Sequence, residues 1–136
     1  MVKAMATYSS YSSDDLRGVD PVQLGLHGFC FVAARILADA HPEAGWWRLT
    51  DNGDHPFAHV FVCIDGEARD VRGKRTANVM AEELRDTDPD IGLLSKKRTS
   101  AREVEEYFRH KNYSREQLQA VREVLTEHLG NQPGGL

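Results

Sequence analysis

The dipeptide Asp65-Gly66 constrains the fold of this chain more than any other feature. It lies between an apolar, β-branched run at 57–64 and a second short run at 67–71. Asp-Gly between two such runs is typical of a two-residue β-turn, in which both central residues adopt positive φ. The sequence therefore predicts an antiparallel hairpin whose strand pairing is set by the turn.

The hairpin also determines which side chains share a face. With the turn at these two residues, Ile64 pairs with Glu67 and the pairing continues outward. Because side chains alternate between the faces of a strand, His59 and Asp70 fall on one face as diagonal neighbours, together with Cys63. A carboxylate beside an imidazole selects its tautomer and stabilises the imidazolium. The hairpin therefore predicts a His59–Asp70 pair.

The run at 29–40 predicts a buried helix. Arg35 and Asp39 are its only charged residues, it is rich in Ala, and Pro42 follows its end. A helix that is apolar almost all round is a buried one. It would begin at Cys30, where the positive end of the helix dipole favours the thiolate. With a protonated histidine opposite, Cys30 would be an activated nucleophile.

The rest of the chain predicts an α+β fold with a buried N-terminal helix on a small antiparallel sheet, followed by two or three amphipathic C-terminal helices. The further elements expected are a helical turn at 21–24, a strand at 46–50, a helix at 76–85, a loop at 86–97, and helices at 100–111 and 114–130. Capping boxes are expected at Ser100 with Glu103 and at Ser114 with Gln117. The basic run Lys96-Lys97-Arg98 is expected to be a solvated part of the loop.

Length and composition set the remaining limits. The chain has 136 residues, and 17 Lys and Arg against 21 Asp and Glu give a net charge of −4. We expect one domain at 16–130, a flexible arm at 1–15 and a flexible tail at 131–136. The acidic balance argues against a nucleic-acid partner, and no apolar run predicts a membrane span or a signal peptide. A cytoplasmic protein with reduced thiols is expected.

The order of these residues resembles that of a known enzyme superfamily. The pieces that carry the resemblance are Gly28-Phe29-Cys30, Ala58-His59-Val60-Phe61-Val62 and Ala68-Arg69-Asp70-Val71-Arg72-Gly73. A cysteine at a helix start, a histidine on one strand and an aspartate on the next resemble the papain-like and transglutaminase-like cysteine enzymes. Short proteins of phages and actinobacteria with a Cys, His-Val and Asp-x-Arg-Gly pattern are similar as well.

The resemblance implies a role for each member of the triad. Cys30 would be the nucleophile, His59 the general base and acid, and Asp70 the residue that orients the ring. Gln23 would be the oxyanion donor that papain-like enzymes place shortly upstream of the cysteine. It lies seven residues before Cys30, one more than the papain spacing, and Phe31 stands where the family has a tryptophan.

Other residues are candidates for a substrate cleft or a ligand site. Trp46, Trp47 and His55 could line a cleft, although adjacent strand residues point to opposite faces, so at most one of the two tryptophans would do so. Cys30, His59, Cys63 and His27 are of zinc-ligand types, but no Cys-x-x-Cys or His-x₃-His pair is present. No metal or other cofactor is therefore expected.

Two functions from different classes remain open at this point. The first is a cysteine-nucleophile hydrolase or acyl transferase, acting on an amide, ester or thioester of a protein or peptide-like substrate, as a protease, deamidase or transglutaminase-like enzyme does. The second is a non-enzymatic interaction or inhibitor domain, such as a phage or host-interference protein. In that case Cys30 is a small buried residue, His59 bonds a backbone carbonyl and Asp70 forms an ion pair with Arg69 or Arg72.

Overall fold

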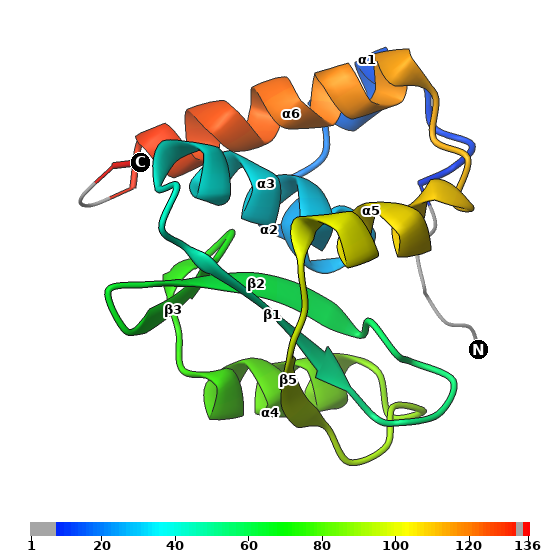
Figure 1. The fold of residues 1–136 in the computed structure, drawn as a ribbon. Helices are drawn as coiled ribbons and strands as arrows, with labels where there is room; N and C mark the ends of the chain where they lie inside the picture. The colour runs from blue at the N-terminus through cyan, green and yellow to red at the C-terminus, as the bar shows by residue number, and fades with distance from the viewer. Residues whose placement is uncertain (1–7, 133–134) are drawn as a thin grey trace.

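The computed structural model describes residues 8–132 and 135–136. The helices are α1 (Ser13–Arg17), α2 (Pro21–Leu26), α3 (Cys30–Ala40), α4 (Ala77–Thr87), α5 (Ala101–Arg109) and α6 (Arg115–Gly130). The strands are β1 (Gly45–Thr50), β2 (His59–Ile64), β3 (Glu67–Asp70), β4 (Gly73–Lys74) and β5 (Ser95–Arg98). Figure 1 shows α4 below the sheet and the other helices above it. The α+β class is confirmed.

The five strands form one antiparallel sheet in the order β4-β3-β2-β1-β5. The turn between β2 and β3 has the expected geometry, because Asp65 and Gly66 both have positive φ, 53° and 82°. Ile64 pairs with Glu67, which is the register that the turn predicts. The hairpin prediction is confirmed.

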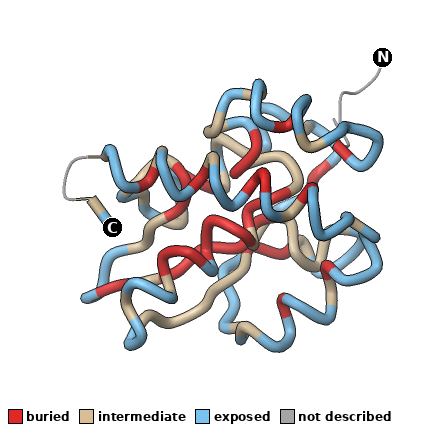
Figure 2. Tube along the Cα trace, turned by 90° about the horizontal axis from the view of Figure 1, so that it is seen from above, coloured by how far each residue is buried: buried red, intermediate tan, exposed pale blue. Residues whose placement is uncertain are grey.

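The sheet separates two apolar clusters. On the α3 side, the side chains of Val60, Val62 and Ile64 pack in the main core with α3 and α6. On the α4 side, Phe61 packs with Leu49 and Met80. The alternation of β2 between these clusters is the period-2 pattern of a strand buried on both faces. Figure 2 shows the buried residues running through the middle of the molecule.

Two helix starts follow local capping chemistry. Ser114 accepts a hydrogen bond from the backbone of Gln117, whose side chain accepts one from the Ser114 N–H, so this capping box is confirmed. Ser100 also caps its helix by accepting from the Glu103 N–H. The Glu103 carboxylate, however, accepts from the Thr99 hydroxyl, so the expected reciprocal bond to Ser100 is not the one formed.

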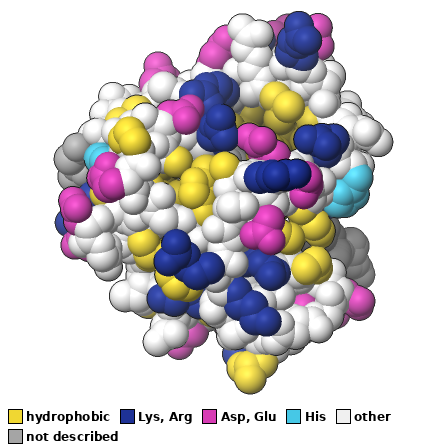
Figure 3. All heavy atoms as spheres, viewed as in Figure 1, with side chains coloured by type: hydrophobic (Ala, Val, Ile, Leu, Met, Phe, Trp, Pro, Cys, Tyr) yellow, Lys and Arg dark blue, Asp and Glu magenta, His cyan; other side chains and the backbone are white. Residues whose placement is uncertain are grey.

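The expected loop at 86–97 is wrong at its end, because Ser95–Arg98 forms strand β5 beside β1. This segment has no strand composition of its own, and all four residues are exposed. Its pairing with β1 places Lys96 4.6 Å and Arg98 5.0 Å from the centre of the Trp47 ring. Charged residues are typical of an edge strand, where they oppose pairing with other chains. Figure 3 shows Lys and Arg side chains gathered on this face.

The flexible arm expected at 1–15 is wrong for residues 8–15, while residues 1–7 lie outside the described part of the chain. Tyr8 is only 6% exposed and belongs to the main core. The Gln117 side chain fixes this segment by donating to the backbone carbonyls of Ser9 and Tyr11. Burial of Tyr8 in the main core therefore anchors this Ser-rich segment, although its sequence shows no periodic pattern of apolar residues.

The tail expected at 131–136 also begins as ordered chain. Gln132 donates a 2.7 Å hydrogen bond to the carbonyl of Val71, which also contacts His128 on α6. Residues 133–134 lie outside the described part. Within the residues described, no helix is long and apolar enough to cross a membrane.

Candidate active site

Cys30 is the first residue of α3, as the sequence predicts. Gly28, with φ of 127°, allows the chain to turn from α2 into α3, and few residues other than glycine adopt this conformation. Phe29 occupies the N-cap position and forms no side-chain cap. Since the first N–H groups of a helix have no acceptor within it, those of Cys30 and Phe31 remain free to bind an added acceptor. The Cys30 side chain itself is buried, with the residue 5% exposed.

His59 and Asp70 form the predicted pair across the hairpin. The imidazole Nε2 lies 2.9 Å from the Asp70 Oδ2, and both residues are 2% exposed. Arg72 holds the same carboxylate through its backbone N–H at 2.8 Å and its guanidinium at 2.6 Å. Arg72 in turn pairs with Glu83 on α4. The carboxylate is therefore fixed from two sides, and it fixes the ring.

The pair is charged at neutral pH. Burial favours the neutral ring, but Asp70 and Cys30 together outweigh it and raise the pKa of His59 to about 9. Burial likewise opposes ionisation of Asp70, yet His59 and Arg72 hold the pKa of that carboxyl far below its usual value. An imidazolium with a carboxylate behind it is the arrangement that stabilises a neighbouring thiolate.

The Cys30 side chain lies close to the imidazole of His59. The Cys30 side chain raises the pKa of His59 both through a polar contact and through its charge. Nε2 is taken by Asp70, while Nδ1 is buried and has no hydrogen bond of standard geometry among the described residues. Nδ1 is therefore the atom that can exchange a proton with Cys30 or with a group bound next to it. The structure brings all three predicted triad residues together.

Aromatic rings from α5 and from the residues after it pack against Phe29 and Phe31 at the start of α3. Tyr107 stacks on Phe57 with the ring centres 4.5 Å apart, and Tyr113 lies 4.4 Å from Phe29. Burial first, and then the charge of Cys30, raises the pKa of both tyrosines. Both phenols therefore stay protonated at neutral pH.

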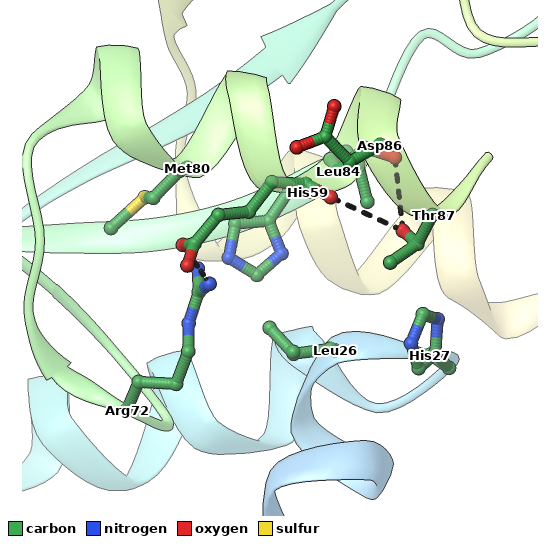
Figure 4. A pocket seen from close by; sticks show the side chains of 9 residues that line it. Leu26, His27, His59, Arg72, Met80, Leu84, Asp86 and Thr87 are labelled. Carbon is green, nitrogen blue, oxygen red and sulfur yellow. Dashed lines mark hydrogen bonds and ion pairs between the residues drawn. The ribbon is translucent and has the colours of Figure 1, made fainter. Parts of the chain in front are cut away.

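A cavity of about 330 Å³ adjoins His59 between the end of α2 and helix α4. Its lining residues are Leu26, His27, His59, Arg72, Met80, Glu83, Leu84, Asp86 and Thr87. Figure 4 shows the His59 ring between Met80 and Leu26. Burial, and then the nearby His59, lowers the pKa of His27, which keeps that ring neutral. His59 thus lies close to Cys30 and also lines a space that a small group could fill.

The other candidate site residues lie elsewhere. Gln23 is exposed on α2. Trp46 packs against the main core, whereas Trp47 packs on the opposite face of the sheet beneath Lys96. His55 bonds Asp51 at 2.9 Å in the loop after β1. None of Gln23, Trp46, Trp47 and His55 lines the cavity beside His59.

Cys63 and a metal site are the remaining candidates that the sequence offers. Cys63 is half-buried on β2, and burial raises the pKa of its thiol. Among the residues described, no group of three His, Cys, Asp or Glu side chains is arranged to hold a metal ion.

The cavity and the two tyrosines were not identified from the sequence. Met80 and Glu83 belong to the amphipathic helix α4, and nothing in the sequence of this helix indicates that it packs beside His59. Tyr107 and Tyr113 reach Cys30 only because α5 and the loop after it pack against the start of α3.

Comparison with known proteins identifies no relative of this chain. No family model, no curated protein and no solved structure matches the chain.

Proposed function

We propose that this protein is a cysteine-nucleophile hydrolase or acyl transferase, with Cys30, His59 and Asp70 as its triad. The observation that carries the proposal is the buried His59–Asp70 bond of 2.9 Å, with Cys30, the first residue of α3, close enough to His59 to raise its pKa. An ion pair between His59 and Asp70 that served only stability would not require a cysteine close to the histidine. Strongly perturbed titratable groups that converge on a nucleophile are typical of catalytic sites.

The proposed reaction proceeds through a thioester. The Cys30 thiolate attacks the carbonyl carbon of an amide, ester or thioester, forming a C–S bond and placing the negative charge on the carbonyl oxygen. As the oxygen re-forms its double bond, the bond to the leaving group breaks, and His59 Nδ1 donates its proton to that group. Water or an amine then attacks the thioester, gives its proton to His59, and releases the thiolate. Asp70 keeps Nδ1 directed at these atoms throughout.

The cavity beside His59 supports a place for a neighbouring part of the substrate, since His59 lines it and Cys30 does not. The leaving group and the second nucleophile must each exchange a proton with His59 and bond the carbon that Cys30 attacks, so both bind beside this cavity rather than inside it. A space of about 330 Å³ accommodates a side chain rather than a folded partner. We therefore propose a protein or peptide-like substrate that presents a single residue to the site, and we place the reaction in the cytoplasm, where Cys30 and Cys63 would stay reduced.

The test is acylation by p-nitrophenyl acetate, which reports an activated thiol without knowledge of the substrate. In a Cys63→Ala background, the proposal expects a burst of p-nitrophenolate that corresponds to one acetyl group per chain, located on Cys30 by mass spectrometry. Cys30→Ser and His59→Ala should each abolish the burst. If the parent protein shows no burst, the enzymatic proposal fails and the interaction or inhibitor function becomes the better one.

A further inference from the structure

We propose that Tyr113 donates a hydrogen bond to the substrate carbonyl oxygen while Cys30 attacks, alongside the first N–H groups of α3. The inference rests on the proposed function, because it assigns a donor to the oxyanion which that reaction forms. It replaces Gln23, whose exposed position on α2 offers no such contact.

Tyr113 packs against the two residues that flank Cys30 in the sequence, Phe29 and Phe31. Its ring lies 4.4 Å from that of Phe29 and 6.5 Å from that of Phe31, measured between ring centres. Its hydroxyl oxygen is 3.2 Å from the position that a Cβ on Gly28 would occupy. The hydroxyl therefore lies directly over the turn that leads into α3. It has room there because Gly28 has no side chain.

The hydroxyl is also free to donate. Within the described part of the chain, no hydrogen bond engages the Tyr113 oxygen, although the residue is half-buried. Burial first, and then the electrostatic interaction with Cys30, raise the pKa of this phenol, so it keeps its proton at neutral pH. A phenol hydroxyl that bonds no other group of the protein can donate to a bound carbonyl oxygen.

The direction of attack places the oxyanion on this side of the thiol. His59 occupies one side, so the leaving group that takes its proton departs there. The carbonyl oxygen must then point away from His59, toward the N–H groups of Cys30 and Phe31 that the helix leaves unpaired. The Tyr113 hydroxyl lies over the Gly28 turn that leads to these two N–H groups. Tyr107 instead stacks on Phe57, just before the strand that carries His59, and serves as the matched control.

Two reactions of the same thiol distinguish an oxyanion donor from a structural tyrosine. Acetylation by p-nitrophenyl acetate forms the C–S bond through an oxyanion and then breaks the ester C–O bond. Alkylation by iodoacetamide forms a C–S bond while iodide leaves, and no oxyanion arises. Both rates are measured for Cys30 in the Cys63→Ala background, with Tyr113→Phe and Tyr107→Phe as the two variants, each of which removes a single hydroxyl.

The proposal expects Tyr113→Phe to slow acetylation by roughly 10²-fold, the loss typical of one oxyanion donor, and to leave the alkylation rate unchanged. Tyr107→Phe should leave both rates unchanged. Unchanged acetylation in Tyr113→Phe, an equal fall in both reactions, or a selective loss in Tyr107→Phe would each overturn the assignment. If Cys30 of the parent protein reacts with neither reagent faster than an ordinary thiol, the proposed function fails, and the Tyr113 assignment fails with it.

Discussion

Replacing Asp70 with asparagine tests how the hairpin charges His59. The substitution keeps the shape of the side chain and an oxygen that can accept from Nε2, but it removes the carboxylate that lies 2.9 Å from the ring. Burial then remains as the main influence on His59, and burial favours the neutral imidazole. We expect the pKa of His59 to fall from about 9 to its ordinary value of 6.5 or below.

The expected magnitude follows from the two protonation states. A pKa raised from 6.5 to about 9 corresponds to about 3 kcal/mol in favour of the imidazolium in the folded protein. Because the folded pKa is the higher one, this stabilisation is fully present below pH 6.5 and is lost as the pH rises through about 9. The advantage of wild type over Asp70→Asn in the free energy of unfolding that comes from His59 should therefore be full at pH 6.5, and it should shrink as the pH rises toward 9.

The assay combines NMR titration of the histidine side chains with urea unfolding at several pH values. Asp51→Asn is the matched control, since Asp51 lies 2.9 Å from His55 in a loop away from the triad. It should leave the titration of His59 unchanged. The reasoning is refuted if His59 of Asp70→Asn still titrates near pH 9, or if the stability difference stays constant across this range.

Three further substitutions test the packing and the site. Gly25→Ala would place a Cβ 2.4 Å from that of Val71, so urea unfolding should show a loss of about 1–3 kcal/mol, whereas an equally stable variant would refute the close contact. Leu125→Ala, at a fully buried position on α6, should cost about 2–5 kcal/mol in the same assay, and a loss typical of a surface site would contradict its place in the core. Gln23→Ala should leave both the acetylation and the alkylation of Cys30 unchanged, and slower acetylation alone would restore Gln23 as the oxyanion donor.

The part of the site that lies in the hairpin could be predicted from the sequence because its geometry is local. Asp65-Gly66 sets the register, the register sets which side chains share a face, and the His59–Asp70 contact follows from that alternation. The start of α3 at Cys30 was equally local, since a glycine and an Ala-rich run mark it. That Cys30 meets His59 depended on the resemblance, because only packing of α3 on the sheet brings them together.

The parts that were missed depend on contacts between distant segments. Strand β5 has the composition of a solvated loop and becomes a strand only by pairing with β1. Tyr8 is held by the core and by α6, neither of which its Ser-rich neighbours reveal. The cavity beside His59 needs α2 and α4 to face each other across the end of the sheet, and no spacing within either helix encodes that arrangement.

The most direct test of an activated Cys30 is its alkylation by iodoacetamide at neutral pH, followed by mass spectrometry for each cysteine separately. Cys63 is the internal reference, because it is the more exposed of the two and burial raises the pKa of its thiol. The account predicts that Cys30 reacts faster than Cys63 despite its burial, and that His59→Ala reverses the order. Slower reaction of Cys30 in the wild type, or a rate that His59→Ala does not change, would contradict it.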